Sequence, residues 1–81
     1  MGINIVVTTY ADFQATVSSL PKKVSVYFFT ETSGSCLIWA VASDFSALIH
    51  VTLSAQPSTL TTDYPSAVGF DPSWTGTVTL V

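Results

Sequence analysis

The sequence has very few charged side chains and no arginine. Charged residues make up 9% of the 81 residues, Lys22 and Lys23 are the whole basic complement, and the formal net charge is −3. Nucleic-acid-binding proteins neutralise several phosphates with basic side chains. The sequence therefore predicts no nucleic-acid partner. Disorder is not expected either, because 48% of the residues are hydrophobic and a disordered segment combines low hydrophobicity with high charge.

Cysteine and histidine are equally scarce, with one of each. Cys36 has no second cysteine to pair with, so an internal disulfide is excluded, and a single His50 argues against a structural zinc site. Cys36 begins an apolar run, where we expect a packed thiol. Domains this small usually supplement their core with a disulfide, a metal or oligomerisation. The sequence therefore predicts oligomerisation or docking on a partner.

Long apolar runs are absent. The longest, Cys36 to Ala42, has seven residues, whereas a membrane-spanning helix needs about 20. No basic residue precedes the apolar residues 3–7, so no signal peptide is expected. We therefore expect no membrane span and synthesis in the cytoplasm, where Cys36 would remain reduced.

One helix has clear start and stop signals. Residues 3–8 form a β-branched run that predicts the first strand. Thr9 is a suitable N-cap, with Asp12 three residues later, and Pro21 ends the helical region. The helix between them has an apolar stripe at spacings of three and four, made of Tyr10, Phe13, Val17 and Leu20.

Three further strands are predicted over residues 22–30, 36–43 and 47–54. Gly34 lies in the first connecting turn and Asp44 in the second, and both are turn formers. The fold class is therefore α+β, in a single small domain. The order is β-α-β-β-β, with one helix on a mostly antiparallel four-stranded sheet. The strands on either side of the helix should be parallel, and the last three should form a meander.

Residues 55–81 have a different character, so we divide the chain into a sheet domain, 1–54, and a C-terminal arm, 55–81. Prolines and glycines interrupt the arm up to Gly76, which disfavours a central strand. Its apolar residues still need burial, so we expect it to pack on the domain or on a neighbouring subunit. Residues 77–81 alternate and predict a short final strand, on this sheet or on a neighbour's edge.

No constellation of residues predicts catalysis. Ser43, Asp44 and His50 contain the groups of a nucleophilic triad, but no strand-turn-helix elbow surrounds a serine. His50 is better interpreted as a sheet residue. Asp63 and Asp71 fit no calcium-loop spacing, and there is no glycine-rich phosphate loop. We expect no enzyme activity, no cofactor, no metal and no small-molecule substrate.

The predicted strands carry apolar side chains on both faces, and one helix covers only one of them. Residues two apart on a strand share a face, and tryptophan and tyrosine are enriched at interface hot spots. An alternative is that the arm folds back over the second face within the same chain. The residues that we predict for an interface are Tyr27, Phe29, Leu37, Trp39, Val41, Phe70 and Trp74.

The stretch Thr9-Tyr10-Ala11-Asp12-Phe13, with the helix stripe and aromatic strand that follow, resembles short β-α-β modules of bacteriophage tail-fibre and other virion proteins. The resemblance extends to about Thr30, and the threonine-rich arm is similar to virion proteins in style only. It implies a structural subunit or attachment module of the virion, tail-fibre or capsid-associated, without enzymatic activity. It assigns no site residues.

These observations favour a non-enzymatic structural or assembly protein, a bacteriophage particle component. It would associate with copies of itself or with another virion protein through the apolar sheet face and the arm. The alternative is a small phage-encoded binding module or inhibitor that docks on a host protein. A stable oligomer in solution favours the first, and a monomer that binds an added partner favours the second.

Overall fold

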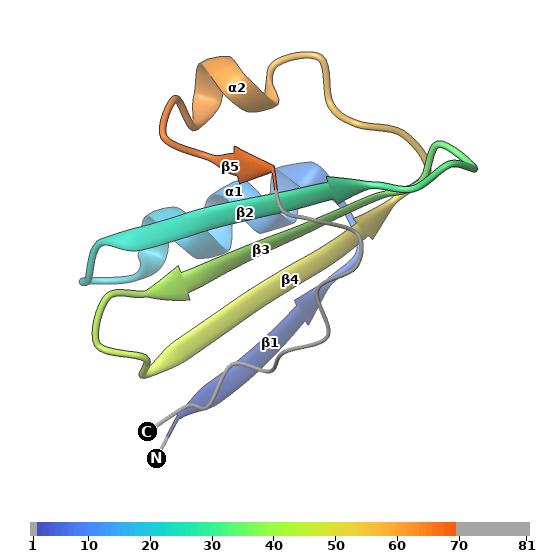
Figure 1. Ribbon diagram of the computed structural model, residues 1–81. Coiled ribbons are helices and arrows are strands. Elements are labelled where there is room, and N and C mark those ends of the chain that lie inside the picture. The colour runs from blue at the N-terminus through green and yellow to red at the C-terminus, as the bar shows by residue number, and fades with distance from the viewer. Residues whose placement is uncertain (1, 70–81) are drawn as a thin grey trace.

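The computed structural model describes residues 2–69, which form one sheet and two helices (Figure 1). The predicted α+β class is confirmed, and the helix and first four strands follow in the predicted order. A second, short helix and a fifth strand come after them. The elements are β1 (Ile3–Val7), α1 (Tyr10–Ser19), β2 (Val24–Thr30), β3 (Cys36–Ala42), β4 (Ala47–Leu53), α2 (Leu60–Asp63) and β5 (Val68–Gly69).

The five strands lie in the order β1-β4-β3-β2-β5. β2, β3 and β4 form the predicted antiparallel meander, because their short turns require consecutive strands to be neighbours. β1 pairs in parallel with β4. β1 and β2 therefore run in the same direction, as predicted, but β4 and β3 lie between them. The crossover through α1 thus carries the chain from one side of the meander to the other (Figure 1).

The two meander turns use local backbone chemistry. Gly34 has φ +100°, in the left-handed region that favours glycine, as the first turn was predicted to need. In the second turn Phe45 has φ 58°. The Asp44 carboxylate supports that turn, since it accepts from the backbone N–H and the hydroxyl of Ser46 at 3.1 and 2.6 Å.

Helix α1 begins and ends where its signals predicted. The Thr9 hydroxyl accepts a hydrogen bond from the Asp12 backbone N–H at 3.1 Å, which satisfies one of the free donors of the first turn. Leu20, the residue before Pro21, is extended and caps the C-terminal end. Within the helix Phe13 is fully buried, so the predicted stripe faces the sheet.

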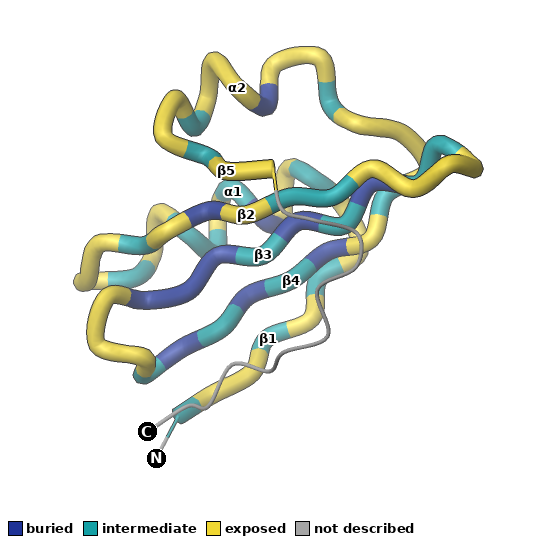
Figure 2. Tube along the Cα trace, in the orientation of Figure 1, coloured by how far each residue is buried: buried dark blue, intermediate teal, exposed yellow. Residues whose placement is uncertain are grey.

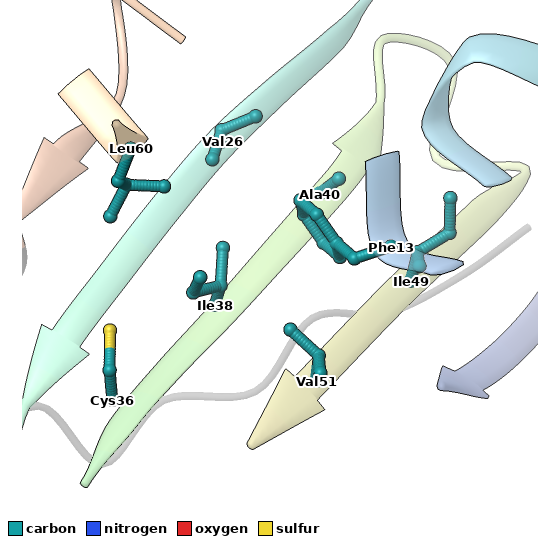
Figure 3. Close-up of a cluster of buried hydrophobic side chains, with 8 residues drawn as sticks. All are labelled: Phe13, Val26, Cys36, Ile38, Ala40, Ile49, Val51 and Leu60. Atoms are coloured by element: carbon teal, nitrogen blue, oxygen red, sulfur yellow. The ribbon is translucent and has the colours of Figure 1, made fainter. Parts of the chain in front are cut away.

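The core lies on one face of the sheet, between the strands and both helices (Figure 3). Phe13 of α1 and Leu60 of α2 belong to the same buried cluster, which places the two helices on the same side. We call this side the covered face. Its strand residues in the cluster are Val26, Cys36, Ile38, Ala40, Ile49 and Val51.

The structure corrects the interpretation of the arm over residues 55–69. A break in regular structure was expected up to residue 77, but Val68 and Gly69 join the sheet beside Tyr27 and Phe28. The sheet therefore has five strands among the described residues, one more than predicted. The strand was not predicted because it has only two residues. Two residues fit between Pro65 and Pro72 without a proline inside the strand. The final strand predicted over residues 77–81 lies outside the described residues.

Candidate interaction surface

The sheet has a second face, opposite both helices, which we call the open face. Side chains alternate along each strand, as the burial pattern of β3 and β4 shows in Figure 2. The residues that alternate with the core positions therefore point away from α1 and α2. They are Asn4, Val6, Ser25, Tyr27, Phe29, Leu37, Trp39, Val41, Leu48, His50 and Thr52.

Strand register arranges the open face in rows that run across the sheet. The middle row joins Val6, His50, Trp39 and Tyr27, one from each of four neighbouring strands. On one side of the middle row, a second row joins Phe29 of β2, Leu37 of β3 and Thr52 of β4. On the other side a row runs through Ser25, Val41, Leu48 and Asn4. Neighbours within a row are close enough for their side chains to contact.

Exposure differs among the side chains of the open face. Val6 is 65% exposed and Tyr27 38% exposed, whereas Leu37, Trp39 and Leu48 are half-buried. Val41 is only 7% exposed, so it supports its neighbours and contributes little contact area. The face thus presents apolar and aromatic surface at its middle row and at the β1 side of the sheet.

No charged side chain among residues 2–69 lies on the open face. The charged groups of this part of the chain are on α1, on the segment before β2, in the two turns and on α2, at Asp12, Lys22, Lys23, Glu31, Asp44 and Asp63. Hydroxyls, one amide and one imidazole supply the polarity of the face. Removing water from such a surface costs less free energy than removing it from a surface that carries charges.

The structure does not assemble a triad from Ser43, Asp44 and His50. Ser43 and Asp44 lie in the β3–β4 turn, whereas His50 is in the middle of β4, four residues past Ser46 and therefore roughly 13 Å along the strand. The Asp44 carboxylate is engaged by Ser46, and Lys22 lies 3.9 Å away. The Ser46 hydrogen bonds, helped by Lys22, lower the pKa of Asp44. These contacts give Asp44 a structural part in the turn.

Asp63 forms a link between the two helices that sequence reasoning missed. Its Oδ2 atom accepts hydrogen bonds from Tyr10 at 2.7 Å, Gln14 at 3.2 Å and Thr59 at 2.7 Å. The bonds from Thr59 and Tyr10 lower the pKa of Asp63. Partial burial, with the adjacent Asp63 carboxylate, raises the pKa of Tyr10. No spacing in the sequence indicated that the partners of Asp63 lie on α1.

Two candidates remain, the Cys36 thiol and the Asp71 carboxylate. Cys36 is fully buried, as predicted, and burial raises the pKa of its thiol, which disfavours the reactive thiolate. Asp71, the other half of the calcium pair considered above, lies outside the described residues. Within residues 2–69 no three metal-ligating side chains form a group that could hold a metal ion.

The structure brings together five of the seven residues predicted for the interface, because Tyr27, Phe29, Leu37, Trp39 and Val41 all lie on the open face. The other two, Phe70 and Trp74, lie outside the described residues. Sequence reasoning missed Val6 and Leu48 as members of the same surface. Their alternation with Ile5 and Ile49 was visible, but their place beside the aromatic row depends on the β1–β4–β3 order.

Comparison with known proteins gives no relative: no family model, no curated protein and no solved structure matches the chain. Among the described residues no helix combines the length and apolar character needed to cross a bilayer.

Proposed function

We propose that this protein is a non-enzymatic assembly subunit that associates with copies of itself through the open face. The observation that carries the proposal is the chemistry of that face. A surface with an aromatic middle row, to which residues 2–69 contribute no charged side chain, lies on the side of the sheet opposite both helices, and Val6 and Tyr27 are exposed on it. Contiguous exposed apolar patches on small proteins mark interaction sites.

The size of the chain supports the same proposal. A domain this small buries a limited share of its surface, so a second contact adds stability that the core alone does not supply. Tyrosine and tryptophan at the centre of a surface also match the composition of interface hot spots. The resemblance to bacteriophage virion modules suggests the setting, a particle in which many copies of one chain meet.

The test is the molar mass in solution of the full chain and of two variants. We expect the wild-type protein to form species larger than the 8.6 kDa monomer. Tyr27→Lys places a charge in the middle row and should lower the molar mass of the assembly while the protein stays folded. Phe45→Asn is the matched control, because it removes a side chain that is 50% exposed and belongs to the β3–β4 turn, outside the strands that form the open face. The control should assemble like the wild type.

Two outcomes would overturn the proposal. A wild-type chain that stays monomeric at all concentrations would instead favour a module that docks on a different protein. Equal assembly by Tyr27→Lys and wild type would show that the open face is not the contact. The particle setting has a separate test, which is detection of the chain by mass spectrometry in purified particles of the virus that encodes it.

A further inference from the structure

The two edges of the sheet are protected differently. The outer edge of β2 is partly covered by β5, and Pro21, Lys22 and Lys23 come just before the strand. Proline, lysine and short covering strands are devices that keep sheet edges from pairing with other chains. The outer edge of β1 has none of them within residues 2–69, because its sequence is Ile-Asn-Ile-Val-Val and no described strand lies beyond it.

The hydrogen bonds of β1 show which backbone groups this edge presents. The Ile3 N–H donates to the Ser46 carbonyl at 3.0 Å, and β1 then pairs in parallel with β4 through Val7. In such a ladder every second residue bonds to the neighbouring strand. Ile3, Ile5 and Val7 therefore direct their N–H and C=O groups toward β4. The corresponding groups of Asn4 and Val6 point away from the sheet.

We propose that β1 pairs antiparallel with β1 of a second copy, about a two-fold axis at Ile5, so that the two sheets become one. In this register Asn4 of each copy lies opposite Val6 of the other. An antiparallel pair of this kind exchanges both of its N–H···O bonds. The register therefore engages all the outward N–H and C=O groups of Asn4 and Val6 in both copies.

The side chains of β1 suit a second copy of the same strand. On the covered side the register sets Ile3 opposite Val7 and Ile5 opposite Ile5, which are apolar β-branched pairs of the kind that stabilise neighbouring strands. On the open side Val6 meets Asn4. No residue of β1 is charged, so the side chains of the two β1 strands do not repel one another. Ile3 and Val6, which are 53% and 65% exposed, would lose exposure on pairing.

The difference between the edges also fixes the type of assembly. A contact between β1 and the β2 edge would be heterologous and would extend into a ring or an open filament of many copies. The lysines, the proline and β5 oppose that contact. Pairing of β1 with β1 uses the same surface on both copies and closes as a dimer. This contact is separate from the open face on which the proposed function rests.

Two measurements on the full chain test the proposal together. The first is molar mass, where the edge-paired dimer is twice 8.6 kDa, or about 17 kDa, and open-face contacts between dimers give a multiple of that mass. The second is amide hydrogen exchange at Asn4 and Val6, with Ile5 and Val7 as internal references because they bond to β4. We expect a dimer, or an assembly of such dimers, in which the Asn4 and Val6 amides are protected as strongly as the references.

Each of the other combinations of molar mass and amide protection would overturn edge pairing and indicate a different arrangement. A monomer with protected Asn4 and Val6 would show that the chain fills the edge itself, for example with residues 77–81. A dimer with unprotected Asn4 and Val6 would be joined elsewhere, which leaves the open-face proposal standing. A monomer with unprotected amides would overturn both proposals.

Two variants of Asn4 separate the contribution of its backbone N–H to dimer stability from that of its side chain. Asn4→Pro removes an outward N–H from each copy but leaves the β4 ladder intact, because Asn4 does not donate to β4. Like Asn4→Pro, Asn4→Ala removes the amide side chain, but it keeps the backbone N–H. We expect the dimer dissociation constant to rise roughly tenfold to thirtyfold for Asn4→Pro relative to Asn4→Ala. Protection at Ile5 and Val7 verifies that β1 stays on β4, and equal dissociation constants would overturn the proposal.

Discussion

The covered and open faces are built from alternate residues of the same strands, yet they differ in what lies above them. On β4 the covered residue Ile49 is fully buried, and its neighbour Leu48 on the open face is half-buried. Both are apolar, so their hydrophobicity does not distinguish them. The difference comes from α1 and α2, which lie over one face only among the described residues. The difference in burial between these two residues thus follows from the layer above the strand.

The two faces also differ in the size of their side chains. Ala40, Ala42 and Ala47 are on the covered face of β3 and β4, and Figure 3 shows the Phe13 ring over Ala40. Small residues leave room for a ring that descends from a helix. The aromatic residues of the middle row, Tyr27 and Trp39, belong to the open face. The strand position beneath the Phe13 ring is therefore small, whereas larger residues such as Ile38 and Ile49 fill other positions of the covered face.

The largest expected effect compares neighbouring positions on the two faces. Ile49→Ala should lower the free energy of unfolding by about 3–4 kcal/mol, because it leaves a cavity under α1. Leu48→Ala should lower it by about 1 kcal/mol or less, since the side chain already contacts solvent. Urea unfolding measures both on the same strand. Equal losses would show that the open face is as deeply packed as the covered one and would remove the contrast.

A somewhat smaller effect is expected where α2 meets the covered face. Leu60 is fully buried in the core cluster although it comes from a four-residue helix. Leu60→Ala should destabilise the protein by about 2–3 kcal/mol. Thr61→Ala is the control, because Thr61 is the next residue and is exposed. If thermal unfolding does not separate the two variants, α2 is not part of the covering layer.

The smallest effect is a pH dependence of the link between the helices. The folded state lowers the pKa of Asp63 below its unfolded value of about 3.9. Its contribution to stability is therefore complete above that pH and is lost as the pH falls through the folded pKa. Asp63→Asn should lower the urea midpoint at pH 7. The deficit relative to wild type should shrink toward pH 2, and a deficit that is independent of pH would contradict a role for the carboxylate charge.

Much of the local structure was predictable because its causes are local. The cap at Thr9, the stop at Pro21 and the turn at Gly34 act over a few residues, and the structure has each as predicted. Period-2 alternation also placed Tyr27 and Phe29 on one face of their strand before any strand order was known, whereas the place of Trp39 on that face follows from the pairing of β2 with β3. These features follow from backbone sterics and hydrogen bonding within a short window.

The sequence by itself determined the α+β class, the helix and its caps, the meander and the division of each strand into two faces. Tertiary structure alone decided that β1 lies beside β4, that Leu60 completes the core, that Asp63 joins α2 to α1 and that β5 pairs with β2. The physical reason is the range of the interactions. Alternation and capping are fixed by neighbours along the chain, whereas strand order and helix placement depend on groups that are distant in sequence and become adjacent only when the core forms.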